Sequence, residues 1–228
     1  NAKYFADNGI LVGQTVVGTP NSFLCTRNNF DNFILEFDVL LNKATNSGVQ
    51  FRSHSNPDYY NGRVHGYQCE IDPSDRKWSG GIYEESFRGW LFPVTDNKNS
   101  QDAFKMGTWN HYRIEAIGAS IRTFINDIPV ANLEDDYTKS GFIALQVHSI
   151  GDKKDDEGIQ IKWKNIRIIT DRPEKYVQST SIPLKQNFNN LTKTELEGGW
   201  KLLWDGKTST GWKSSRGDVF PATGWEMK

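Results

Sequence analysis

Cysteine, net charge and long apolar stretches are all scarce in this 228-residue chain. The two cysteines, Cys25 and Cys69, lack the CxxC or Cys/His spacing of a zinc site, and they leave open either one disulfide or two buried free thiols. Lys and Arg number 27 against 28 Asp and Glu, so the net charge of -1 argues against a general nucleic-acid-binding protein, which needs a basic surplus to neutralise phosphates. No apolar run approaches the roughly 20 residues that cross a bilayer, so no membrane span is predicted.

Several catalytic signatures are missing as well. The chain has no serine nucleophile elbow and no HExxH zinc motif. It also has no Gly-rich phosphate-binding loop, and this absence argues against nucleotide chemistry. The acidic stretch "GDKKDDEG" at residues 151–158 does not have the spacing of an EF-hand loop and is typical of a solvated turn. No cofactor is therefore predicted, and a structural or catalytic divalent metal stays open.

Aromatic residues are abundant in this chain, although its hydrophobic residues as a whole are few. Hydrophobic residues make up 36% of the chain, but Phe, Trp and Tyr alone make up 13%. Large aromatic side chains can bury a sizeable core, so the composition excludes a globally disordered chain.

Apolar and polar residues alternate in short segments separated by Gly, Asn and Asp. The apolar residues that share one parity are Phe33, Leu35, Phe37 and Val39; Val49 and Phe51; Tyr67, Cys69 and Ile71; and Ile143, Leu145 and Val147. A period of two predicts half-buried strands. Further strands are expected at 109–116, at 121–125 and in "GIQIKWKNIRII". Many short strands without long amphipathic helices predict an all-β sandwich of two antiparallel sheets.

The opposite parity of three of these strands carries groups suited to chemistry. These outward residues are Gln50, Arg52 and His54; Gln68, Glu70 and Asp72; and Gln146 and His148. A merely solvated face would usually carry Lys, Thr and Ser, whereas this set offers carboxylates, amides, a guanidinium and imidazoles that can move protons near neutral pH. If the three strands are neighbours, these side chains converge in one cleft.

Aromatic residues in "RKWSGGIYEESFRGWLFP" are expected on a long, Gly-punctuated loop beside this cleft. Tyr83 and Trp90 are the two that we expect to contact a ligand. Aromatic rings next to hydrogen-bonding side chains suit sugars, whose C–H faces pack on rings while their hydroxyls bind polar groups. The alternative is that the rings pack beneath the loop.

The composition and periodicity of the sequence change after residue 171. Residues 172–197 are polar, contain two prolines and show no alternation, which indicates a linker or a tail lying along the edge of the domain, with a short helix after Thr192. Residues 198–228 return to an aromatic, turn-rich pattern but are too few to bury a core alone.

The segments "GVQFRSH", "GYQCEIDPSD", "SGGIYEE", "WNHYRIEAIGASIRTFINDIPV", "GFIALQVHS" and "WKNIRI" occur in that order. Together they resemble the 3-keto-disaccharide hydrolase family, which implies a concanavalin A-like jelly-roll sandwich over residues 1–171. "GWKLLWDGKTSTGW" resembles the opening strand of the same family, and the first domain lacks that strand. Residues 198–228 are therefore expected to open a truncated second copy of the domain, or to supply the strand that completes the first.

The resemblance also implies a chemistry and a set of roles. In a 3-keto sugar the ketone acidifies the proton at C2, so a base can remove it while the substituent at C1 leaves, and water adds afterwards. Glu70 or His148 would be the base and Arg52 would stabilise the enolate. Gln146 and Asp72 would hold hydroxyls. From the outward parity and the aromatic stretch, Gln50, His54, Gln68, Tyr83 and Trp90 are also expected to contact the sugar.

The leading hypothesis is a hydrolase or lyase that cleaves 3-keto-glycosides, with a sugar or glycoside as its ligand and a periplasmic or cell-surface location. One alternative is a non-catalytic carbohydrate-binding module on the same sandwich, because a fold alone does not decide function. Another is an interaction domain whose second copy serves avidity.

Overall fold

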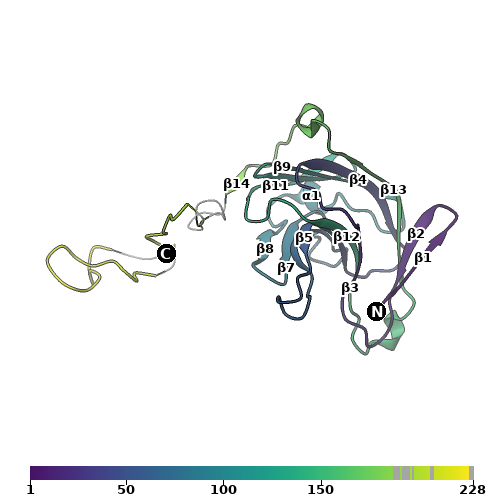
Figure 1. Cartoon of the computed structure of the whole chain (residues 1–228), viewed down its shortest axis with the longest axis horizontal. Coiled ribbons are helices and arrows are strands. Elements are labelled where there is room, and N and C mark those ends of the chain that lie inside the picture. Colours follow the sequence, from purple (N-terminus) through teal and green to yellow (C-terminus); the bar gives the residue numbers. More distant parts are fainter. Residues whose placement is uncertain (187–190, 192–195, 197, 206–207, 226–228) are drawn as a thin grey trace.

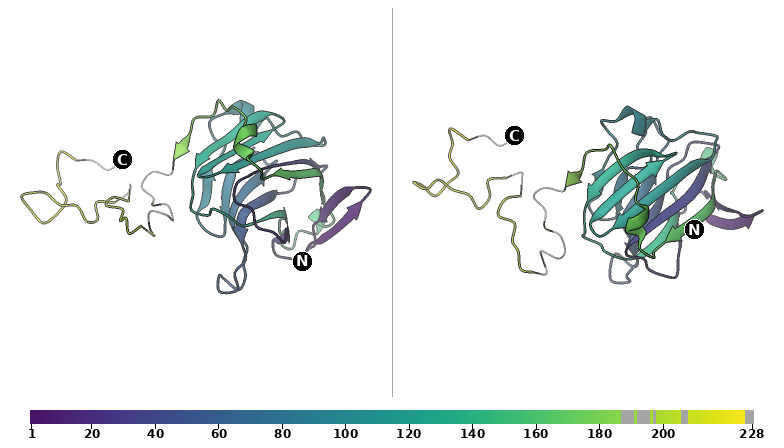
Figure 2. Two further views of the ribbon diagram at one scale, coloured as in Figure 1. Left: turned by 45° about the horizontal axis from the view of Figure 1, so that its top comes forward. Right: turned by 90° about the horizontal axis from the view of Figure 1, so that it is seen from above.

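The computed structural model describes residues 1–228 except 187–190, 192–195, 197, 206–207 and 226–228. Its folded part is a sandwich of two β-sheets packed face to face, with the C-terminal segment extending away from it (Figures 1 and 2). The predicted all-β sandwich is confirmed. The helix expected after Thr192 falls largely on residues outside the described part.

The larger sheet has eight strands within the described residues. In spatial order they are β1 (Lys3–Asp7), β2 (Ile10–Gln14), β13 (Gln160–Ile169), β4 (Phe33–Leu41), β9 (Asn110–Ile117), β10 (Ser120–Ile125), β11 (Ile128–Glu134) and β14 (Lys185–Gln186). All its neighbours pair antiparallel except β11 and β14, which pair parallel.

The smaller sheet has six strands within the same residues, all paired antiparallel. Their order is β3 (Ser22–Cys25), β12 (Phe142–Val147), β5 (Ser47–His54), β6 (His65–Ile71), β7 (Ile82–Glu85) and β8 (Gly89–Phe92). Short helical turns complete the described elements: α1 (Lys98–Gln101), η1 (Lys154–Asp156) and η2 (Pro173–Tyr176). None of the helices in the described part is long and apolar enough to cross a membrane.

The core lies between the two sheets and is built from the alternating residues that the sequence predicts. All the apolar residues of shared parity on β4, β5, β6 and β12 are buried, with Trp163 of β13 among them. Aromatic rings pack within and between the layers: Phe37 of β4 stacks on its neighbour Tyr112 of β9 at 5.2 Å between centroids, and Phe33 of β4 meets Phe51 of β5, in the other sheet, edge-on at 6.4 Å. Such contacts add to the area that aromatic residues bury. Both cysteines are free thiols; Cys69 is part of the core and Cys25 is exposed.

The expectation of a long loop across residues 76–93 is wrong. This stretch forms β7 and β8, which extend the smaller sheet beyond β6. Each strand has only four residues, so neither shows a usable alternation by itself. Pairing with the long β6 supplies the ladder hydrogen bonds that hold them in place.

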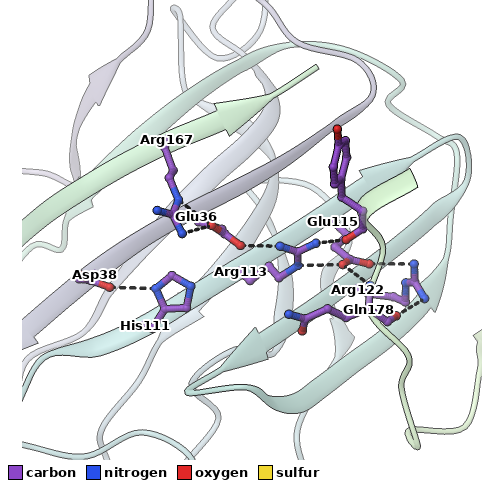
Figure 3. A network of polar contacts seen from close by, with 9 residues as sticks. Glu36, Asp38, His111, Arg113, Glu115, Arg122, Arg167 and Gln178 are labelled. Carbon is purple, nitrogen blue, oxygen red and sulfur yellow. Dashed lines mark hydrogen bonds and ion pairs between the residues drawn. The ribbon is translucent and has the colours of Figure 1, made fainter. Parts of the chain in front are cut away.

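Residues 173–186 lie across the outer face of the larger sheet, and we call them the strap. Figure 3 shows Glu115 bound by two arginines, Arg113 and Arg122, with the strap residue Gln178 alongside. The backbone N–H of Gln178 donates to Glu115 Oε1 at 2.8 Å, and its carbonyl accepts from Arg122 at 3.0 Å. Ile182 is buried farther along, and β14 then joins β11. The strap is thus a packed part of the domain face.

Residues 198–225 differ from the sandwich in their burial. The described residues of this segment form no strand with either sheet, and Trp200, Trp204, Trp212 and Trp225 are exposed. An opening segment of a second copy would expose such residues until its own sheet formed. That second copy stays a prediction.

Candidate functional site

A polar cavity of about 340 Å³ opens on the face of the smaller sheet that is turned away from the core. Its lining residues are Asn21, Asn46, Gln68, Glu70, Arg76, Tyr83, Glu85, Trp90 and His148. Strand register explains why these distant residues meet, since Gln50, Gln68, Tyr83 and Trp90 are successive partners across β5, β6, β7 and β8. The structure therefore brings together five of the predicted residues: Gln68, Glu70, Tyr83, Trp90 and His148.

A chain of hydrogen bonds below the cavity ends at Glu70. Ser53 Oγ donates to Gln50 Oε1 at 2.7 Å, and Gln50 Nε2 donates to Gln68 Oε1 at 2.7 Å. Gln68 Nε2 then donates to Glu70 Oε1, and Asn46 Nδ2 donates to Glu70 Oε2 at 3.2 Å. Each amide in the chain has its orientation set by the group before it, so Glu70 Oε1 faces a fixed donor, and Asn46 supplies the donor to Oε2.

Gly48 makes room for this arrangement. It pairs with Glu70 across β5 and β6, and a Cβ placed on it would lie 2.5 Å from Cδ of Gln68. A side chain at this position would have to displace Gln68, so glycine allows the Gln68 amide to lie over β5 and reach Glu70.

Burial sets the proton affinity of Glu70. The residue is 3% exposed, and desolvation raises the pKa of its carboxyl from 4.5 to about 7, with Asp72 and Glu85 contributing further repulsion against the donors from Gln68 and Asn46. A carboxyl with a pKa near neutrality exchanges protons readily at physiological pH, as a general base requires.

Glu85 is a second carboxyl in the cavity, and it was not among the outward residues predicted from the alternation of the three strands. Burial raises the pKa of Glu85, against hydrogen bonding and the nearby charge of His148. Burial also raises the pKa of the Tyr83 hydroxyl, with Glu85 and Glu70 adding to the effect. Two carboxyls that hold protons more tightly than usual in one cavity allow one to act as acid while the other acts as base. Placing β7 as a strand would have identified Glu85, since it shares parity with Tyr83.

His148 lies at the end of β12 on the cavity wall. Its Nδ1 is 2.8 Å from the carbonyl oxygen of Ser149, which can only accept, so Nδ1 carries a proton and donates it there. Gln146, two residues earlier, is buried beneath the wall, where its Nε2 lies 3.5 Å from Glu85 Oε2. Gln146 thus supports the site and does not line it.

Aromatic rings form one side of the cavity. Trp90 packs edge-on against Tyr83 at 5.2 Å and against Trp78 at 4.6 Å between centroids. Arg76 also lines the cavity, and the sequence pattern did not single it out because it lies on the turn between β6 and β7.

Arg52 does not belong to this site. The ladder between β5 and β6 shifts register between Phe51 and His54, and Arg52 has a φ of 48°, so the strict alternation that predicts an outward side chain ends there. Its buried guanidinium donates to the carbonyls of Asp31 at 2.7 Å and Gly118 at 2.8 Å. Arg52 therefore connects the two sheets at one end of the sandwich, and its predicted role beside Glu70 and His148 is wrong.

His54 and Asp72 also lie outside the cavity lining. His54 follows the same bulge, and its ring lies 6.0 Å from that of His65. Asp72 is buried at the end of β6, where Oδ1 accepts from the Ser74 backbone at 3.1 Å. Neither residue directly presents a group to a ligand in the cavity.

No group of three or more His, Cys, Asp or Glu side chains arranged to hold a metal ion occurs among the described residues. The cavity residues supply acids, amides, an arginine and aromatic rings.

The fold and the polar face define a β-sandwich of the galectin-like, jelly-roll class. Among solved structures, a Bacillus subtilis protein of unknown function with a galectin-like fold matches at 11% identity and a TM-score of 0.55, over 73% of this chain and 85% of that one. The carbohydrate-binding module CBM66 from Bacillus subtilis matches at 15% identity and a TM-score of 0.54, over 75% of this chain and 92% of that one. A Parabacteroides distasonis protein predicted to be a glycosyl hydrolase matches at 21% identity and a TM-score of 0.53, over 73% of this chain and 89% of that one.

Within this class, the chain belongs to the family of 3-keto-alpha-glucoside-1,2-lyase-like domains, whose model matches residues 1–169. The predicted family is thereby confirmed. A search of curated proteins found no match to this chain.

Proposed function

We propose that this domain cleaves 3-keto-glycosides by base-assisted elimination followed by addition of water. The observation that carries the proposal is Glu70, a buried carboxyl with a pKa of about 7 that faces a sugar-sized polar cavity. Family membership supports the same reaction class. Elimination needs a base near neutral pH and does not need the paired displacement by two carboxylates that ordinary glycosidases use.

The residues divide into roles that the geometry supports. Glu70 removes the proton from C2, and its fixed donors prevent it from turning away. Glu85 keeps its proton more tightly than an exposed glutamate and donates it to the departing glycosidic oxygen. Trp90 and Tyr83 provide the apolar wall for the sugar ring.

The test is incubation with a nitrophenyl 3-keto-glucoside, following release of nitrophenol, with the unoxidised nitrophenyl glucoside as the matched control. Release from the keto substrate alone is expected, together with its loss in Glu70→Gln. Turnover in deuterium oxide adds a mechanistic readout, because elimination and hydration place a solvent deuteron at C2 whereas direct displacement leaves the original hydrogen there. Retention of the C2 hydrogen during cleavage would refute the elimination route.

The aromatic wall also suits a carbohydrate-binding module. Binding of keto and unoxidised sugars with equal affinity and without any release would favour that function instead. His148→Ala separates the two possible bases: if it abolishes release while Glu70→Gln does not, His148 is the base. The periplasmic or cell-surface location and the second copy of the domain stay predictions.

A further inference from the structure

Arg76 is fixed at the cavity by contacts on two sides. Its Nη2 lies 2.7 Å from Oδ2 of Asp72, whose side chain is only 3% exposed. The guanidinium carbon lies 4.9 Å from the centroid of the Trp78 ring and 5.5 Å from that of Trp90. Contacts of this kind hold a guanidinium in place while leaving its edge available.

The held cation also faces the cavity. Arg76 lines it together with Glu70 and Tyr83, and its side chain is 51% exposed. In the described part of the structure, Arg76 pairs with Asp72 and packs on the indoles of Trp78 and Trp90. A guanidinium has five N–H donors, so donors beyond those directed at Asp72 can bind a ligand.

We propose that Arg76 binds the C3 oxygen of the substrate and stabilises the enolate, the role that the family resemblance implied for Arg52. This inference rests on the proposed function. Arg76 is the only arginine or lysine among the described lining residues, and its planar guanidinium suits the binding of an oxyanion. The other lining groups are carboxyls, amides, aromatic side chains and the His148 imidazole, so Arg76 is the one guanidinium whose N–H donors can meet an oxygen with growing negative charge.

The elimination passes through an enolate of the 3-keto sugar. Glu70 takes the proton from C2, and the C–H electron pair forms the C2–C3 double bond while the ketone oxygen becomes an oxyanion against Arg76. The C3 carbonyl then reforms, the C1–C2 double bond forms, and the C1–O bond breaks with its electron pair going to the leaving oxygen, which takes the proton of Glu85. In the hydration, water adds its hydroxyl to C1 and gives its proton to Glu85, while Glu70, after exchange with solvent, returns a proton to C2.

The test compares Arg76→Met and Arg76→Lys with Arg167→Met, a matched control whose guanidinium pairs with Glu36 on the opposite face of the molecule. Loss of a donor to a developing oxyanion costs about 100- to 1,000-fold in kcat. We expect that loss in Arg76→Met, a smaller loss in Arg76→Lys, wild-type kcat in the control, and unchanged binding of the unoxidised glycoside in all of them.

The outcomes separate the two proposals. If the wild type does not cleave the keto substrate, the proposed function fails and this inference falls with it. If the wild type is active but Arg76→Met and Arg76→Lys keep its kcat, only the role of Arg76 is refuted. An equal rise in KM for keto substrate and Kd for the unoxidised glycoside, with kcat unchanged, also refutes it, because Arg76 would then bind ground state and transition state alike. Asp72→Asn keeps the shape of the partner and should lower kcat in the same direction, even if Arg76→Met folds poorly.

Discussion

Replacing Glu70 by Gln should make the protein less stable in acid and more stable in mild alkali, while abolishing cleavage. Gln has the size of Glu but cannot ionise, so the substitution removes the cost of a buried negative charge. It also places an amide N–H₂ against the donors of Gln68 and Asn46, and one of those hydrogen bonds is lost. The two effects have opposite signs and depend differently on pH.

The magnitudes follow from the pKa of Glu70. Burial raises this pKa from 4.5 to about 7, and about 1.36 kcal/mol per pH unit makes the ionised side chain about 3 kcal/mol less favourable in the folded protein. Because the pKa is raised, this cost is absent below pH 4.5, grows between 4.5 and 7, and is complete above 7. The lost hydrogen bond costs about 1 kcal/mol at every pH. Glu70→Gln should therefore be about 2 kcal/mol more stable than the wild type at pH 8 and slightly less stable at pH 5.

Urea denaturation of both proteins at pH 5 and pH 8 measures the difference, and kcat/KM of the wild type should rise with pH through an apparent pKa near 7. Glu134→Gln is a suitable control, because Glu134 is exposed on β11. A stability difference between wild type and Glu70→Gln that does not change with pH would refute the reasoning, since it would mean that Glu70 ionises as an exposed carboxyl does.

Two further predictions concern packing. Gly48→Ala should displace Gln68 from Glu70, at a cost of about 1–3 kcal/mol of stability. Because the Glu70 carboxylate then loses a hydrogen-bond donor, its pKa rises and the pH profile of kcat/KM should move to higher pH. An unchanged profile would show that Gln68 does not lower the pKa of Glu70. Ending the chain at residue 171 removes the strap, including the buried side chain of Ile182, whose burial alone contributes about 1.5–3 kcal/mol of stability. The urea midpoint of this shorter chain should therefore fall well below that of a chain ending at residue 186. Equal midpoints would show that the strap adds no stability.

Periodicity identified most of the sandwich because each long strand buries one face. The alternation in β4, β5, β6 and β12 depends only on which side chains avoid water, and it therefore placed the core residues correctly. It also placed Glu70, Gln68 and His148 on one face, since parity carries across antiparallel neighbours. Their cavity could be predicted as far as the strands were regular.

The same rule failed where the backbone departs from a regular strand. The bulge at Arg52 turned a predicted enolate stabiliser into a link between the two sheets. Arg76 was missed because it lies on a turn, where no period exists. Glu85 was missed because β7 is too short to be recognised without β6 beside it.

By itself, the sequence determined the fold class, the core and the existence of a polar sheet face, because these follow from local alternation and composition. Only the tertiary structure decided which polar groups share the cavity, which arginine faces it, and how far burial raises the pKa of Glu70. Those properties depend on strand register, on a bulge and on the exclusion of water by residues distant in the chain. No local pattern encodes them, since each arises from contacts that exist only after the sheets have paired.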